Sequence, residues 1–150
     1  SLKDLAAGTF QTVIGEVTEM DPKKVKRVVA CAGKIYFELA AARREHKVDN
    51  VALLRIEQLY PFDDRRFVEE LRKYPKATEV VWCQEEPENQ GAWYAKAHRL
   101  TAALQKGQTL TVVSRPACAS PASGYAARHV QEQKDVVERA LGLNQAGLQK

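Results

Sequence analysis

The chain contains 150 residues, of which 45% are hydrophobic and 28% are charged, and its formal net charge is +4. This length and composition are typical of one soluble globular domain with a full core. No apolar run approaches the roughly 18 residues of a membrane-spanning helix. The N-terminus lacks the charged start and long apolar core of a secretory signal. Basic residues are interleaved with acidic ones, which argues against nucleic-acid binding.

The first half of the chain predicts three strands and two helices. Apolar runs predict strands over 10–17, 25–33 and 48–59. Apolar residues at helical spacing predict a helix over 34–46. A second helix is expected after Asp63 or Asp64, either of which can serve as its N-cap, and Pro75 is expected to stop it.

The second half continues the same alternation. Apolar runs predict strands over 77–84 and 109–116. Between them, a helix is expected over 89–105 with Asn89 as its N-cap. The last helix is expected to start at Ser120 with Pro121, or at Ser123. Its apolar face is expected to contain Ala126, Val130, Gln133, Val137 and Leu141.

Strands that alternate with helices and read as buried on both faces indicate an α/β fold. We predict a three-layer α/β/α open sheet that is mostly parallel. The segment 10–17 is the candidate antiparallel edge strand, because the short connection TEMDPKK that follows it has no room for a helix. In such folds, ligands and partners bind at the carboxyl ends of the strands.

One of these strand ends carries an unusual stretch, VVWCQEEPENQGAWY, which contains both tryptophans of the chain around an acidic turn. Glu85 and Glu86 could act as a general acid and base, but no histidine, nucleophilic cysteine or serine elbow is near them in sequence. Their charge also suits the positive end of the helix that follows. We therefore interpret one set of residues as bracing this loop or contacting a neighbouring domain: Trp82, Glu85, Glu86, Asn89 and Trp93.

A second strand end, VACAGKIY, places Gly33 and Lys34 where a strand enters a helix. Free backbone N–H groups at such a point attract anions, although the stretch is not a P-loop because it lacks a second glycine and a Ser or Thr after the lysine. A structural turn and an anion contact both remain open. One hypothesis groups four basic residues at one edge of the sheet, where they would bind AMP or the phosphates of an acyl-CoA: Arg27, Lys34, Arg115 and Arg128.

The sequence predicts no metal site and no catalytic residue. The three cysteines are odd in number and far apart, which predicts reduced thiols: Cys31, Cys83 and Cys118. The three histidines have no partner at i+3 or i+4 and are expected to be surface or packing residues: His46, His98 and His129.

Long motifs in this chain closely resemble the C-terminal domain of 2-oxoglutarate dehydrogenase, the thiamine-diphosphate-dependent decarboxylating component of its complex. The motifs are VALLRIEQLYPF, VVWCQEEPENQGAW, RPACASPASGYAARHVQEQKDVVERAL and DPKKVKRVVACAGKIYFEL. The resemblance covers about residues 9–142. Related transketolase-like C-terminal domains share the α/β plan but not the QEEPENQGAW string.

The resemblance implies a homodimeric enzyme of the tricarboxylic acid cycle. Such an enzyme decarboxylates 2-oxoglutarate on thiamine diphosphate with magnesium and passes the succinyl group to a lipoyl arm of dihydrolipoyl succinyltransferase. In that family the cofactor lies between two other domains, and the G-D-G metal motif is absent here. We therefore expect 1–150 to be a single domain of a larger enzyme, inactive when isolated and unable to bind the cofactor. The resemblance also implies a cytoplasmic location, or the mitochondrial matrix in a eukaryote.

Two alternatives are also considered. The chain could be a free-standing module that binds a nucleotide or an acyl-CoA, an idea supported by effector binding at this domain in some members of the family. It could instead be a small enzyme that uses Glu85 or Glu86. The start at Ser1 rather than Met favours a piece of a longer protein over both.

Overall fold

The computed structural model describes residues 8–119 and 126–143, and for 126–129 it describes the backbone alone. One sheet has the strand order β1-β3-β2-β4-β5. β1 pairs antiparallel with β3, and the other strands are parallel. The strands are β1 (Val13–Ile14), β2 (Arg27–Cys31), β3 (Val51–Ile56), β4 (Glu79–Pro87) and β5 (Thr109–Arg115). The predicted mostly parallel sheet with an antiparallel edge strand is confirmed.

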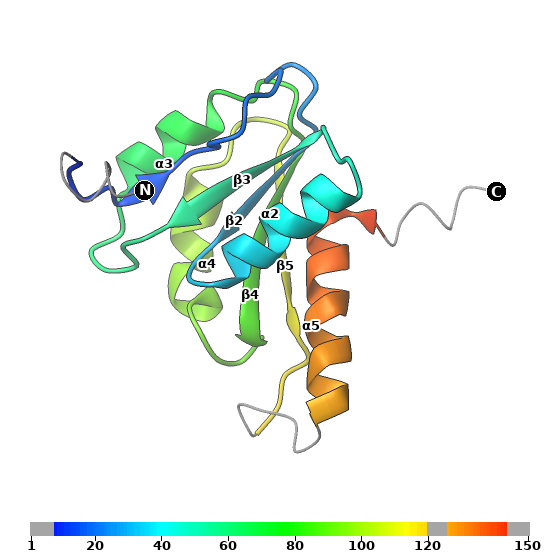
Figure 1. Cartoon of the computed structure of the whole chain (residues 1–150). Coiled ribbons are helices and arrows are strands. Elements are labelled where there is room, and N and C mark those ends of the chain that lie inside the picture. The colour runs from blue at the N-terminus through cyan, green and yellow to red at the C-terminus, as the bar shows by residue number, and fades with distance from the viewer. Residues whose placement is uncertain (1–7, 120–125, 144–150) are drawn as a thin grey trace.

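Helices cover both faces of this sheet. They are α2 (Ile35–Glu45), α3 (Asp64–Leu71), α4 (Trp93–Ala102) and α5 (Ala126–Leu141). Figure 1 shows α2 and α5 on one face and α3 and α4 on the other. The expected three-layer α/β/α arrangement is therefore confirmed.

The central strands alternate their side chains between two cores, one for each face. In β2, Val28 and Ala30 belong to the cluster on the α3 and α4 side. Val29 and Cys31 belong to the cluster on the α2 and α5 side. β2 is buried along its whole length because it lies in the middle of the sheet. Full burial of an aliphatic side chain such as that of Val29 contributes about 1.5–3 kcal/mol to the stability of the fold. The central strands therefore stabilise the packing of the helices on both faces of the sheet.

Helix boundaries follow the sequence signals in part. The side chain of Asp63 caps α3 by accepting a hydrogen bond from the Arg66 backbone N–H at 2.9 Å, as predicted. α3 ends at Leu71, ahead of Pro75. In α5, Val137 and Leu141 are buried as predicted, but the assignment of Val130 to the buried face is wrong, since its side chain is 67% exposed. The expected start of α5 at Ser120, Pro121 or Ser123 lies outside the described residues.

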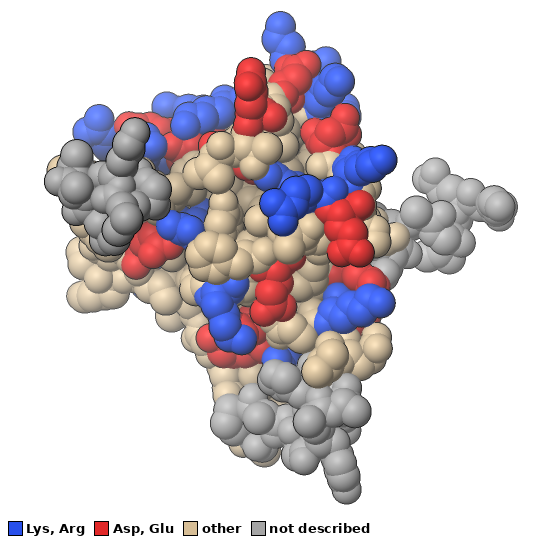
Figure 2. Space-filling model, viewed as in Figure 1, with Lys and Arg blue, Asp and Glu red and all other residues tan. Residues whose placement is uncertain are grey.

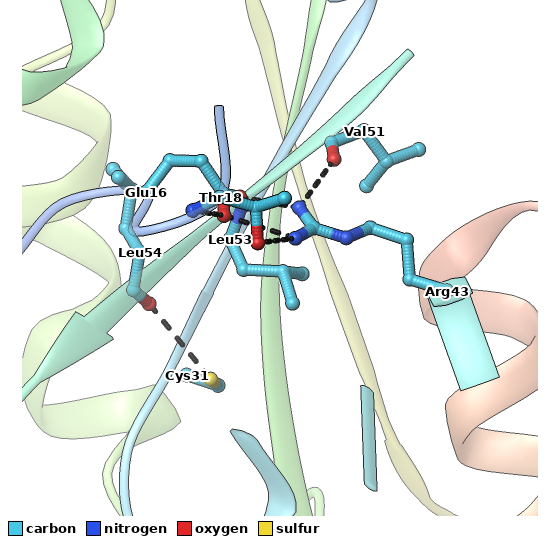
Figure 3. A network of polar contacts seen from close by, with 7 residues as sticks. All are labelled: Glu16, Thr18, Cys31, Arg43, Val51, Leu53 and Leu54. Atoms are coloured by element: carbon cyan, nitrogen blue, oxygen red, sulfur yellow. Dashed lines mark hydrogen bonds and ion pairs between the residues drawn. The ribbon is translucent and has the colours of Figure 1, made fainter. Parts of the chain in front are cut away.

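The predicted first strand, 10–17, is correct only over Val13–Ile14. Beyond Ile14, a side chain rather than the backbone of this segment forms the hydrogen bond with β3. The carboxylate of Glu16 accepts a hydrogen bond from the Leu53 backbone N–H at 2.9 Å, as a strand carbonyl would. The guanidinium of Arg43 on α2 pairs with both oxygens of this carboxylate. Arg43 also donates to the Val51 carbonyl at 3.0 Å. Figure 3 shows this cluster between β3 and α2.

The Glu16–Arg43 ion pair is buried, with side chains that are only 4% and 7% exposed. Removing one partner of a buried pair leaves the other charge without compensation, which typically costs about 3–5 kcal/mol. We expect Glu16→Gln to lower the free energy of unfolding by about this amount at neutral pH. Urea denaturation followed by circular dichroism measures the change.

The same pair predicts part of the acid sensitivity of the fold. Burial alone raises the pKa of Glu16, but the hydrogen bonds from Arg43, Leu53 and Thr18 outweigh it and bring the pKa below its usual 4.5. A pKa that is lower in the folded state means that this stabilisation is complete above about pH 4.5 and is lost as the pH falls from there through the folded pKa.

We expect Glu16→Gln to lack this contribution to the decrease in unfolding free energy with falling pH. The control is Glu19→Gln, which removes an exposed carboxylate from the same segment and should keep the wild-type slope. An unchanged slope in Glu16→Gln would contradict the assignment.

Candidate functional site at the carboxyl edge of the sheet

The stretch that contains both tryptophans is organised around one buried amide, that of Gln84. Gln84 is 3% exposed. Its Oε1 accepts hydrogen bonds from Trp82 Nε1 at 2.9 Å and from the Trp93 backbone N–H at 3.1 Å. Its Nε2 donates to the carbonyls of Gln90 at 2.8 Å and Pro87 at 3.1 Å. One side chain therefore joins the end of β4, the turn and the start of α4.

Gly91 makes room for this amide. Its φ of +68° is in the left-handed region that favours glycine, and an added Cβ would lie 3.1 Å from Gln84 Nε2. The sequence reasoning missed Gln84. A signal for it was present, because alternation along a strand places residue 84 on the same side as the buried Trp82.

Asn89 does not cap α4, so this prediction is wrong. The helix begins at Trp93, and its N-cap residue is Ala92, which has no side-chain cap. The amide of Asn89 instead forms two hydrogen bonds of 3.0 Å with the backbone of Cys118: its Nδ2 donates to the carbonyl and its Oδ1 accepts from the N–H. Asn89 thus ties the turn to the chain that follows β5. Its assignment to loop bracing or to an interface stays a prediction.

Glu85 forms an ion pair with Lys34, with Nζ and Oε2 2.9 Å apart. The hydrogen bond and the charge of Glu85 raise the pKa of Lys34. The partner of Glu85 therefore lies at the start of α2, rather than at the start of α4 where we expected its charge to act. Glu86 is exposed and lines a cavity beside α4. The two adjacent glutamates do not form a pair of facing carboxylates.

The four basic residues grouped in the effector hypothesis do not all meet. Lys34 and Arg115 lie at the carboxyl ends of their strands, and Arg115 donates to Gln133 Oε1 at 2.9 Å. Arg27 begins β2, at the opposite end of the sheet, where it pairs with Glu79 at 2.5 Å. Its inclusion in the group is therefore wrong. The side chain of Arg128 lies outside the described part of the structure.

The buried thiols are not set up as nucleophiles. Cys31 and Cys83 face each other on β2 and β4, and both are buried and free. Burial raises the pKa of Cys31 to about 12 and raises that of Cys83 as well. Both groups are therefore neutral thiols at neutral pH, and neutral thiols are poor nucleophiles and poor metal ligands.

Charged groups of opposite sign alternate on the molecular face in view. Figure 2 shows Lys and Arg side chains interspersed with Asp and Glu across this face. Among the residues that the structure describes, no three His, Cys, Asp or Glu side chains gather where they could hold a metal ion. No helix within the described ranges is long and apolar enough to cross a membrane.

The family model of the 2-oxoglutarate dehydrogenase C-terminal region matches residues 1–141. The chain belongs to this family. The E1 component of 2-oxoglutarate dehydrogenase from Coxiella burnetii is 50% identical over 145 residues, which cover 95% of this chain and 16% of that protein. The E1 component from Haemophilus influenzae is 52% identical over 143 residues, covering 95% of this chain and 15% of the relative. The resemblance seen in the motifs is confirmed.

More distant members of the family agree. The E1 component from Azotobacter vinelandii is 44% identical over 144 residues, covering 94% of this chain and 15% of that protein. The chain thus spans 15–16% of the length of these curated relatives and corresponds to their C-terminal part.

Replacement of the buried amide tests the organisation of this edge. We expect Gln84→Leu to lower the free energy of unfolding by about 3 kcal/mol or more, because each buried polar group left without a partner costs about 1–3 kcal/mol. Thermal and urea denaturation measure the loss.

The matched control is Gln90→Leu, which removes only one exposed side-chain hydrogen bond, to the Cys118 carbonyl. Its effect should be small, about 0.5–1.5 kcal/mol at most. Equal losses in the two variants would show that Gln84 is not the centre of this network.

Proposed function

We propose that the chain is the C-terminal domain of a 2-oxoglutarate dehydrogenase E1 component and acts there as a structural part of the enzyme. The observation that carries this proposal is the family match over residues 1–141, which covers nearly the whole folded unit. The geometry supports a structural role, because Gln84, Asn89 and Glu85 are all engaged with protein partners.

The complete enzyme would decarboxylate 2-oxoglutarate with thiamine diphosphate and magnesium and pass the succinyl group to a lipoyl arm of dihydrolipoyl succinyltransferase. The residues of this chain do not fit that cofactor. The sequence has no G-D-G motif, and the described residues form no cluster for a metal ion. We therefore assign cofactor binding and chemistry to other domains of the enzyme, and no catalytic residue to this one.

A groove of about 600 Å³ along α2 supports a role in assembly. Phe37 on α2 is 64% exposed and Val17 is 68% exposed, and both line this groove. Exposed apolar side chains gathered in one groove are typical of surfaces that another protein surface covers. We propose that remaining domains of the enzyme, or a second subunit of a homodimer, pack here.

A chimera tests this role. The corresponding C-terminal region of the Haemophilus influenzae E1 component would be replaced by this chain, and 2-oxoglutarate-dependent reduction of an artificial electron acceptor would be measured. We expect the chimera to be active, and we expect Glu85→Gln within it to leave turnover nearly unchanged. A turnover loss of about 100-fold or more in Glu85→Gln, with assembly and melting unchanged, would instead indicate acid–base catalysis.

Tryptophan variants of the same chimera report on structure. Trp82 is 1% exposed, and Trp93 is partly buried against the same core. Truncating a buried tryptophan costs roughly 3–5 kcal/mol, so Trp82→Ala should lower stability by about this amount and Trp93→Ala by less. Both should impair assembly in proportion to lost stability. Full stability of Trp93→Ala together with lost turnover would contradict the structural role.

We also propose that AMP or an acyl-CoA, if it regulates the enzyme at this domain, contacts Lys34. The side chain of Lys34 is 71% exposed and lies at the start of α2, whose backbone N–H groups favour an anion. A bound phosphate would compete with Glu85 for this lysine. Arg115 is less suited to direct contact, because it is only 6% exposed.

Titration of the active chimera with AMP and with acetyl-CoA tests this contact. If either ligand changes turnover, we expect Lys34→Ala to raise the ligand concentration that gives half of the effect by about tenfold. This corresponds to a loss of about 1.4 kcal/mol in binding free energy. The control is Lys76→Ala, which removes an exposed lysine away from the carboxyl ends of the strands. Equal responses in Lys34→Ala and in the control would remove Lys34 from the site.

A further inference from the structure

A small cavity lies where the connections of two neighbouring strands diverge. β2 and β4 are adjacent in the sheet, but α2 leads from β2 to β3 on one side and α4 leads from β4 to β5 on the other. Such a divergence opens a crevice beyond the carboxyl ends of the two strands, and ligands of open α/β sheets bind there. The cavity has a volume of about 260 Å³, and Ala32 after β2 and Trp82 of β4 line it.

The size and lining of the cavity indicate a compact ligand with an apolar body. A volume of about 260 Å³ is several times the roughly 30 Å³ that one water molecule occupies in the liquid, and it is just below the range of drug-sized pockets, about 300–1,000 Å³. Apolar side chains form most of the wall: Ala32, Leu59, Trp82, Ala92 and Ala95. The Tyr60 ring at its border is 87% exposed.

The positive charge in this cavity is that of Lys96. This residue of α4 is only 9% exposed and lines the cavity. No described residue forms an ion pair with it or accepts a hydrogen bond from it. Its contact is with the face of the Tyr60 ring, 5.6 Å from Nζ to the ring centre. The stem of Lys96 is buried, but its ammonium is open to solvent in the cavity, so it can bind a ligand that enters there, and the cation–π contact uses none of its N–H donors.

The polar neighbours leave Lys96 available to a ligand. The Gln84 amide also lines the cavity, but its oxygen already accepts two hydrogen bonds and its nitrogen donates to two carbonyls. The start of α4 borders the cavity through Gly91 and Ala92 and adds the positive end of a helix dipole. Glu86 lines the same cavity and is exposed, so its carboxylate opposes a second negative charge on the ligand.

We propose that this cavity binds a small organic monocarboxylate, with the carboxylate on Lys96 and the apolar body against Trp82. The ammonium of Lys96 has three N–H donors, and one or two of them can donate hydrogen bonds to the carboxylate oxygens. Closure of the Tyr60 ring over the ligand body removes apolar surface from water. This binding needs no other domain and does not depend on the enzymatic role proposed above.

Benzoate is a suitable probe because it is a flat monocarboxylate smaller than the cavity. We expect it to bind this chain saturably with a Kd of about 1 mM or below, measured by calorimetry and by fluorescence of the adjacent tryptophans. Amide NMR shifts should centre on Ala32, Gly91 and Lys96. Benzamide, which is isosteric but neutral, and phthalate, which carries two negative charges, should each bind at least about tenfold more weakly.

Two variants locate the site. Lys96→Met keeps the apolar stem but removes the charge, and it should weaken benzoate binding by about tenfold or more. The matched control Lys106→Met, at an exposed lysine beyond α4, should bind benzoate as the wild type does. Ala95→Leu, at an exposed position on α4, should block binding by filling the cavity, so the site stays testable if Lys96→Met does not fold.

The proposal is wrong if benzoate fails to bind, if Lys96→Met or Ala95→Leu binds it as the wild type does, or if benzamide binds as tightly as benzoate. Binding of inorganic phosphate is measured as a further comparison. Tighter binding of phosphate than of benzoate would show that the lysine attracts anions without the apolar cavity and would equally overturn the proposal.

Discussion

The hydrogen bonds of the Gln84 amide are the constraint on which the carboxyl edge of the sheet depends. Beyond Cys83, the regular pairing of β4 with β5 breaks, and the chain must turn within a few residues to begin α4. The backbone of this turn would lose hydrogen-bond partners as it leaves the sheet. A buried amide with two donors and two acceptor sites supplies them, so the turn is fixed by one side chain from the strand itself.

Side chains also satisfy backbone groups of β3, where the short outer strand β1 no longer covers it, and of the outer strand β5. On one side, the Glu16 carboxylate accepts the Leu53 N–H where β1 has ended. On the other side, Arg139 of α5 donates to the Ser114 carbonyl of β5 at 2.6 Å. Unpaired backbone groups on an edge strand are sites at which further strands can add. Occupying them with charged side chains helps to limit the sheet to its five strands.

The sequence was informative wherever the signal was local or periodic. Apolar runs placed the buried strands, and the Asp63 cap was correct because its partner is three residues away. Asn89 has the same type of local signal, but its amide binds the backbone of Cys118, 29 residues further along the chain. Gln84 satisfies the Trp93 N–H in its place. A cap prediction fails where a tertiary partner competes for the side chain, and no local pattern reveals that partner.

Arg27 and Lys34 show that the sequence alone also does not predict which charged residues lie close together. Seven positions separate them in sequence, yet Arg27 begins β2 and Lys34 follows the end of that strand, so they lie at opposite ends of the sheet. Arg27 there binds the carbonyls of Arg139 and Ala140 at 3.1 Å, near the C-terminal end of α5, where a cation suits the helix dipole. Its role is to fasten a helix, and only the topology of the sheet reveals it.

The two glutamates of the acidic turn lie on opposite faces of the sheet because side chains alternate along a strand. Adjacent residues of β4 direct their side chains to opposite faces of the sheet. Glu85 therefore pairs with Lys34 on the α2 side, and Glu86 lines the cavity with Lys96 on the α4 side. Each face thus receives one lysine and one carboxylate, but only the pair on the α2 side is closed by direct contact. On the α4 side, Glu86 and Lys96 line the cavity without direct contact. The ammonium of Lys96 is therefore available to the carboxylate of a ligand that enters the cavity.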